Sequence, residues 1–270
     1  MLKPLPITLA LALSGALLLV AAPACAQATD RALLSAFCDA ANIRPATCKR
    51  AKNYPSAGRR ACDVTLNKDR ASGRFIASGN PLLVVAYDSS CEAHATDNGG
   101  AVVFEEIAGK FLFRSFQPGM QTRDCVTLAK NTQQDILVCL TGHVGQGLME
   151  TGVAQMIFTR DFDGRVSLAL DFLLTAEDSN GAYGANVVTC KEGAKYFEVS
   201  KLRVGPRPGT VSVEASFADA DTVRTACGKG FPKPKETFGT LAPGDAYAPD
   251  DFEKHGRLII DIAARKIAPE

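Results

Sequence analysis

The sequence predicts a mainly β protein, propeller-like or a sandwich of antiparallel strands, with a short N-terminal helical hairpin and stabilising disulfides. Short apolar runs recur at even spacing with glycine or polar turn signals between them, which is typical of sandwiches, barrels and propellers. Of the nine cysteines, all but Cys25 lie beyond an N-terminal leader, and Trp is absent. These observations predict many short strands held by covalent cross-links.

The N-terminus has the order of a secretory signal peptide. A basic residue is followed by the apolar run 9–22, and the small residues Ala24 and Ala26 precede Gln27. The run is shorter than the ~20 apolar residues that a transmembrane helix needs. We expect cleavage between Ala26 and Gln27 and a mature chain, without a transmembrane segment, that is periplasmic or secreted. The alternative is a lipoprotein acylated at Cys25.

The remaining cysteines are even in number, and in an exported chain this predicts a disulfide framework. No pair has the Cys-x2-Cys spacing of a zinc site, so neither a metal nor a cofactor is expected. Centring a hairpin on Thr132 places Cys125 opposite Cys139, within disulfide reach. Order along the chain then favours Cys190–Cys227. The first four cysteines leave three connectivities open, of which Cys38–Cys48 with Cys62–Cys91 is favoured.

The mature N-terminal segment, residues 27–60, is expected to be helical. Thr29 and Asp30 can cap a first helix, and Pro45 begins a second short helix that runs to about Lys52. The same segment contains a run of basic residues without acids between Arg44 and Arg60. This run is either a solvated face or a site for an anionic partner. Its members are Arg44, Lys49, Arg50, Lys52, Arg59 and Arg60.

From Cys62 onward the pattern changes to β, and a β domain is expected over 61–228. A loop-rich C-terminal extension, 229–270, is expected to pack on it, with one last strand or short helix over 257–262. The expected strands cover residues 82–87, 101–107, 111–116, 125–129, 135–140, 156–160, 166–174, 187–190, 196–204 and 211–217.

An internal duplication is indicated by units 81–116 and 135–174. PLLVVAYDSS in the first unit is similar to DILVCLTGHV in the second, and each unit has a strand, a polar loop, a strand, a glycine hairpin and a strand. Repeats of this size fit propeller blades or stacked β modules. The alternative is that the units are not copies, because any two three-stranded meanders share this degree of similarity.

The two units loosely resemble the blade repeats of integrin-type propellers, which often carry a calcium loop of alternating Asp residues. The segment Asp161-Phe162-Asp163-Gly164 is similar to such a loop, but the first unit has Ile107 and Ala108 at the matching positions. A glycine hairpin with acids for solubility is the simpler interpretation. The resemblance covers about a third of the chain and implies no function.

Two loops contain the candidate binding residues. They follow the first strand of each unit, over 88–100 and 141–151, and two copies in one assembly would present them at the same edge. Imidazoles and carboxylates brought together in this way can bind a metal or perform acid–base chemistry. In disulfide-bearing loops they also commonly just bond to neighbouring turns. The candidates are Glu92, His94, Asp97, His143, Gln146 and Glu150.

The absence of catalytic motifs and the balance of basic and acidic residues narrow the function classes that we expect. No nucleophile elbow, metalloprotease helix motif, P-loop or dinucleotide fingerprint is present. Basic and acidic residues number 30 and 29, so no nucleic-acid partner is expected. We therefore expect a non-enzymatic envelope protein that binds a protein or an envelope polymer through loops on a β scaffold. The alternatives are a secreted or periplasmic hydrolase using His94 and His143, and a periplasmic inhibitor or immunity-type protein.

Overall fold

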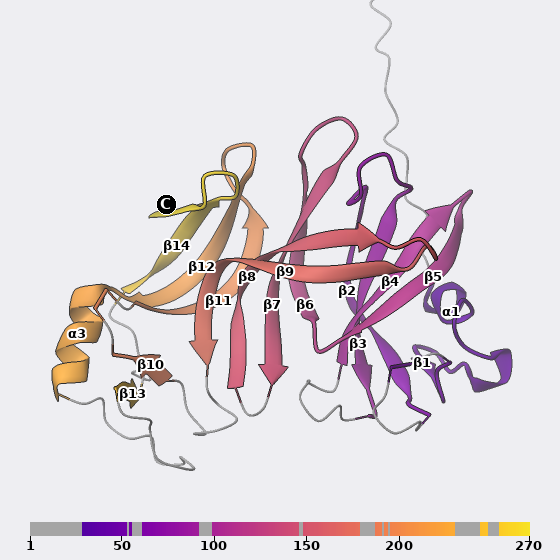
Figure 1. Ribbon diagram of the computed structural model, residues 1–270, viewed down its shortest axis with the longest axis horizontal. Coiled ribbons are helices and arrows are strands. Elements are labelled where there is room, and N and C mark those ends of the chain that lie inside the picture. The colour runs from indigo at the N-terminus through magenta and orange to yellow at the C-terminus, as the bar shows by residue number, and fades with distance from the viewer. Residues whose placement is uncertain are drawn as a thin grey trace, which may run out of the picture.

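The computed structural model describes residues 29–52, 54–55, 61–91, 99–145, 148–178, 187–190, 192–193, 195–229, 244–247 and 254–270. Over these residues the protein is mainly β, with antiparallel strands and few helices (Figure 1). The sheets curl like half-barrels. In Figure 1 the first, central and third sheets of the chain lie side by side from right to left.

The first sheet has the strand order β1-β2-β3-β4-β5. After the two-residue strand β1 it is an antiparallel meander, because each strand pairs with the next one along the chain. Its strands are β1 (Thr47–Cys48), β2 (Val64–Gly73), β3 (Leu82–Ser89), β4 (Gly99–Ile107) and β5 (Lys110–Pro118).

The central sheet is a second meander with the order β6-β7-β8-β9. The segments β3-β4-β5 and β7-β8-β9 begin at Leu82 and Asp135, and β4 and β8 end at Ile107 and Arg160, the same spacing along the chain. The strands are β6 (Gln121–Ala129), β7 (Asp135–Gly145), β8 (Leu148–Arg160) and β9 (Val166–Asp178).

The third sheet has the order β11-β12-β14-β15, so its last two strands come from the expected C-terminal extension. A two-stranded ribbon and a helix lie beside it. The third-sheet strands are β11 (Tyr196–Val204), β12 (Thr210–Ala218), β14 (Lys254–Asp261) and β15 (Lys266–Pro269). The neighbouring elements are β10 (Val187–Thr189), β13 (Asp245–Tyr247) and α3 (Ala220–Lys229).

The N-terminal segment forms one of its two expected helices. Helix α1 (Asp30–Leu34) begins after Thr29, whose side chain accepts a hydrogen bond from the backbone N–H of Ala32, and a 3-10 turn, η1 (Ala40–Asn42), follows. The expected helix from Pro45 to Lys52 is wrong, because the chain there forms β1. Pairing with β2 and the bond of Cys48 to Cys38 outweigh the marginal stability of so short a helix.

The first and central sheets are packed on both faces, and part of the outer face of the third sheet packs on α3 and the β10–β13 ribbon through Tyr196 and Ala218. The α1 segment covers one face of the first sheet, around Leu34, Phe37 and Phe104. The other face of the first sheet packs against the central sheet. The far face of the central sheet packs against the third sheet through residues such as Val138 and Ile260. The core is therefore a stack of apolar layers rather than a single cluster.

Four disulfides are present, and they are the four favoured pairs: Cys38–Cys48, Cys62–Cys91, Cys125–Cys139 and Cys190–Cys227. The predicted hairpin register is confirmed as well. Val126 pairs with Val138 and Thr127 with Leu137, which centres the β6–β7 hairpin on Thr132. The Cα atoms of Cys125 and Cys139 lie 4.1 Å apart. Over the described residues, no helix is both long and apolar enough to cross a bilayer.

Candidate functional site

Most of the candidate binding residues lie outside the described residues. This holds for Glu92, His94, Asp97 and Gln146. His143 and Glu150 are paired directly across β7 and β8 through their backbones. The expected proximity of His94 to His143 therefore stays a prediction.

The expected loop over 141–151 is wrong, because β7 and β8 extend through most of it. Thr141 pairs with Gly152 and Gly142 with Thr151. Gly152, which follows the expected loop, lies where the neighbouring strand approaches closely. A Cβ atom on Gly152 would lie 2.1 Å from the carbonyl oxygen of Leu174, so the next strand passes too close for a side chain.

The β8–β9 loop at 161–165 lies close to β5 and to Glu105 of β4. A Cβ placed on Gly164 would lie 3.7 Å from Nη1 of Arg114, which shows how closely this loop approaches β5. Exposed apolar side chains occur on this loop, at Phe162, and on the β4–β5 hairpin, at Ile107 and Leu112. We call these three side chains the hairpin-tip surface.

Phe162 is the most exposed large apolar side chain among the described residues. Its relative exposure is 111%, compared with 38% for Ile107 and 41% for Leu112. The aromatic ring of Phe162 therefore projects into solvent from the end of the β8–β9 hairpin.

The loop that contains Phe162 is a defined turn. The N–H of Asp161 donates to the carbonyl of Arg165 at 3.0 Å, and the N–H of Gly164 donates to the carbonyl of Asp161 at 3.1 Å. The Asp161 carboxylate accepts from the backbone N–H of Arg165 at 2.8 Å. Gly164 has a φ of 77°, the left-handed conformation that glycine adopts readily. These bonds confirm the simpler interpretation of 161–164 as a glycine hairpin.

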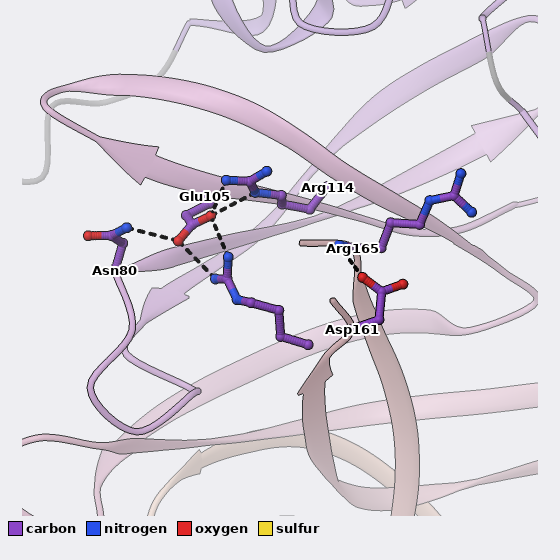
Figure 2. A network of polar contacts seen from close by, with 6 residues as sticks. Asn80, Glu105, Arg114, Asp161 and Arg165 are labelled. Carbon is purple, nitrogen blue, oxygen red and sulfur yellow. Dashed lines mark hydrogen bonds and ion pairs between the residues drawn. The ribbon is translucent and has the colours of Figure 1, made fainter. Parts of the chain in front are cut away.

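A buried ionic network fastens this hairpin to the first sheet (Figure 2). Glu105 on β4 is 1% exposed, and its carboxylate accepts hydrogen bonds from two arginines and an amide. Arg160 at the end of β8 donates to both carboxylate oxygens, at 2.8 and 3.0 Å. Arg114 on β5 donates from Nε at 2.7 Å, and Asn80 donates from Nδ2 at 2.9 Å. Both carboxylate oxygens of Glu105 therefore have hydrogen-bond donors in place of the water that burial removes.

The network holds Glu105 in its ionised form. The hydrogen bonds from Arg160, together with the smaller effects of Asn80 and Arg114, lower the pKa of Glu105 to about 2 against the opposing effect of burial. In return, the Glu105 carboxylate raises the pKa of Arg160. A carboxylate so enclosed and so firmly ionised is a structural anchor, unsuited to exchanging protons with a substrate.

A second set of bonds fastens β5 to the start of β9. The Ser115 hydroxyl and the Gln117 side-chain amide both donate to the carbonyl of Val166, the amide at 3.0 Å. The β8–β9 hairpin is therefore bonded to the first sheet on both sides of the 161–165 loop, through Arg160 and Val166. The loop that carries Phe162 is therefore held in place on both sides.

Sequence reasoning missed this network because its members are far apart along the chain. Glu105 and Arg160 are separated by 55 residues, and nothing local pairs them. Phe162 was noted only within the calcium-loop resemblance. The available signal was a large aromatic residue at the tip of an Asp-Gly turn, where small polar residues are usual.

No protein-family model matches the chain, and no curated protein or solved structure matches it. Within the described ranges, no group of three or more His, Cys, Asp or Glu side chains is arranged to hold a metal ion. The geometry of the site is that of an exposed aromatic ring on a loop that is bonded to the first sheet.

Proposed function

We propose that this chain is an exported, non-enzymatic envelope protein that binds a partner protein through the hairpin-tip surface. The observation that supports this is the fully exposed ring of Phe162 on a loop that Glu105, Arg114 and Arg160 fix to the β scaffold. A rigid aromatic anchor loses little conformational freedom on binding, and aromatic residues dominate the energetics of interfaces.

The shape of the surface favours a protein over an envelope polymer. A projecting ring such as that of Phe162 gains most by entering a concave apolar pocket, which folded proteins offer and hydroxyl-rich polymers do not. Asp161 and Asp163 border the ring in sequence, so a pocket with a polar rim suits it. An inhibitor, which inserts such a loop into its target, is one form of this proposal.

Export and a periplasmic or secreted location belong to the same proposal. They are supported by the leader sequence and by the four disulfides, because such bonds persist in oxidising compartments. The intact mass of the exported protein tests them, since cleavage after Ala26 and acylation at Cys25 give different masses.

For the architecture we propose the propeller-like alternative, with units 81–116 and 135–174 as copies. Support comes from the meander order of the first and central sheets and from their matched spacing between Leu82 and Ile107 and between Asp135 and Arg160. The β4–β5 and β8–β9 turns differ in length, and we attribute that difference to an insertion at 161–165.

A photo-crosslinking amino acid at position 162 tests the binding proposal in intact cells. We expect one protein to be captured from position 162 and not from position 204. Val204 is the matched control, because it is 60% exposed but lies at the end of β11, on the third sheet. The captured protein, purified, should bind the wild type, and Phe162→Ala should weaken binding by about thirtyfold or more, as for an interface hot spot.

Three outcomes contradict the proposal. They are equal capture from positions 162 and 204, unchanged affinity in Phe162→Ala, and capture of a second copy of this chain alone. Hydrolysis of an envelope substrate that disappears when both His94 and His143 are replaced would favour the hydrolase alternative instead.

A further inference from the structure

A hollow of about 540 Å³ lies between the central and third sheets. On the central sheet it is bordered by Thr151 of β8 and Ala176 of β9. Each is two residues from a side chain of the core between these sheets, Val153 or Leu174, and side chains two apart on a strand share a face. The hollow therefore continues the layer of that core, and its size is in the range of sites for small molecules.

The third sheet borders the hollow with the face that looks towards the central sheet. Phe197 and Ala215 pack against the core on that face, and the register places Gly256 opposite Ala215. The residues that alternate with them point to the outer face, where the Ser216 hydroxyl and Nδ1 of His255 are hydrogen-bonded at 2.8 Å. The charged residues at its border belong to the outer face as well: Glu198, Glu214 and Arg257. The side chains of the third sheet that face the hollow are therefore apolar.

Small side chains create the hollow. Farther along the same layer, Val213 of β12 is 0% exposed and Leu258 of β14 is 3% exposed, so the space between the sheets is filled there. In the next row that faces inward, their places are taken by Ala215 and Gly256. A Cβ placed on Gly256 would meet no other atom within 4 Å. The change from Val213 and Leu258 to Ala215 and Gly256 therefore leaves the layer unfilled.

Aromatic and aliphatic side chains beside the hollow are only partly buried, although they face the core. They are Phe197 and Val199 of β11 and Phe217 of β12, and the rings of the two phenylalanines lie 6.3 Å apart. Apolar surface of this kind gains free energy when a ligand removes it from water.

The polar groups around the hollow leave little for a ligand to bond. The Thr151 hydroxyl donates to the carbonyl of Ala176 at 3.1 Å. Strands β8 and β12 each pair on both sides, so their backbone N–H and C=O groups are used in the ladders. A peptide or a sugar buried here would lose hydrogen bonds to water without replacing them, whereas a hydrocarbon chain has none to lose.

We infer that this hollow binds the hydrocarbon chain of a lipid, with the head group in solvent. The chain enters between Ala176 on one sheet and Phe197 and Ala215 on the other. Because no charged side chain of the third sheet faces the hollow, affinity depends on the chain and little on the charge of the head group. The site is independent of the proposed partner surface, since Thr151 and Phe162 lie towards opposite ends of β8.

A single introduced tryptophan tests the inference, because the chain contains none. In Phe197→Trp the indole should line the hollow, and dodecanoate brominated at its terminal carbon should quench the fluorescence by contact. We expect saturable quenching below the concentration at which the probe forms micelles. Phe162→Trp is the control, and its indole, on the hairpin-tip surface, should not be quenched.

Calorimetric titration of the wild type with unbrominated chains measures the affinity itself. From octanoate to dodecanoate it should rise about fourfold for each added methylene, because each methylene is removed from water. Lauroyl-lysophosphatidylcholine distinguishes the two sources of the chain. Binding as tight as that of dodecanoate assigns the site to phospholipid chains as well, and binding of dodecanoate alone assigns it to free fatty acids.

Gly256→Leu is the blocking variant, since its side chain enters the hollow without displacing another atom. It should weaken dodecanoate binding at least tenfold, and an unfolding midpoint no lower than that of the wild type would show that it folds. The matched control is Ser200→Leu, which adds the same side chain to an exposed position in the row of Arg257, on the outer face.

Four results would overturn the inference. They are no binding of dodecanoate to the wild type, equal quenching of the two tryptophans, affinity that does not change with chain length, and equal affinity of Gly256→Leu and Ser200→Leu. None of these results bears on the crosslinks from position 162.

Discussion

The contact between the first and central sheets differs from the contact between the central and third sheets. The first contact ends in a buried ionic network in which Glu105 is 1% exposed and is bonded to two arginines. The second is apolar, with Val138, Val211 and Ile260 fully buried. Directed bonds fix the relative position of the hairpin ends, whereas apolar packing tolerates small shifts and does not respond to pH.

The difference matches the role proposed for the hairpin-tip surface. The ionic network holds the loop that carries Phe162 in a fixed position, as an anchor residue requires. In the third sheet the apolar side chains face the central sheet. Three measurements test whether the two contacts differ in this way.

Replacing Glu105 should have the largest effect. Glu105→Ala leaves Arg114 and Arg160, whose side chains are 22% and 29% exposed, without their shared counter-ion. Removing one partner from a buried ion pair costs about 3–5 kcal/mol, so we expect a loss of about 4 kcal/mol in the free energy of unfolding, measured by urea denaturation.

The control is Asp171→Ala, which removes the exposed partner of Arg265. Exposed pairs contribute about 0–1 kcal/mol, so this variant should be nearly as stable as the wild type. If both variants lose the same amount, the network around Glu105 does not anchor the two sheets.

The second measurement is the pH dependence of stability. The pKa of Glu105 falls from an ordinary value of 4.5 to about 2 on folding. The stability that this shift contributes is present above pH about 4.5 and is lost as the pH falls towards about 2, because the unfolded chain binds the proton first. A shift of this size corresponds to about 3 kcal/mol. Urea titrations across this range should show the loss, and Glu105→Gln should flatten it. A wild-type slope equal to that of Glu105→Gln would exclude this residue as the source.

The smallest effect is expected at the apolar contact. Ile260→Val removes one methylene from a fully buried position between the central and third sheets. We expect a loss of about 1 kcal/mol. The loss should be the same at neutral pH and in mild acid, since no titratable group is changed. A loss that varies with pH would mean that charges also contribute to this contact.

The strands and the disulfides were accessible from sequence because their signals are local. Apolar runs such as 82–87 and 101–107 are bounded by turn residues, and both lie within the strands β3 and β4. The register of the β6–β7 hairpin could be predicted by pairing residues at equal distances on either side of Thr132. Where local pattern and tertiary structure agree, a single sequence is enough.

Other elements depend on distant contacts or on weak local signals. Strand β2 was not named, because its middle is polar and exposed and its pairing with β3 shifts register between Leu66 and Arg70. Helix α3 was also missed, although Asp219 accepts a hydrogen bond from the N–H of Thr222 as a helix cap does. The bond of its Cys227 to Cys190 was favoured by the order of the cysteines, but that pairing does not indicate a helix.

The candidate site was the least accessible part. Glu105 comes to Arg160, and Ser216 to His255, only after sheets form, with 55 and 39 residues between the partners. Of the three histidines, His255 lacked any nearby motif in the sequence, whereas His94 and His143 drew attention because they occur in similar units.

The pairing of the cysteines has a consequence for biosynthesis. Counted from Cys38, every bond joins a cysteine to the next one along the chain, with separations of 10, 29, 14 and 37 residues. An oxidase that acts while the chain emerges, and links each thiol to the next to appear, therefore makes only native bonds. Such a chain has no need of reshuffling, provided that Cys25 does not enter the sequence of pairing. A free Cys25 would shift every partner by one position, so the proposed removal of the leader would also protect the order of oxidation.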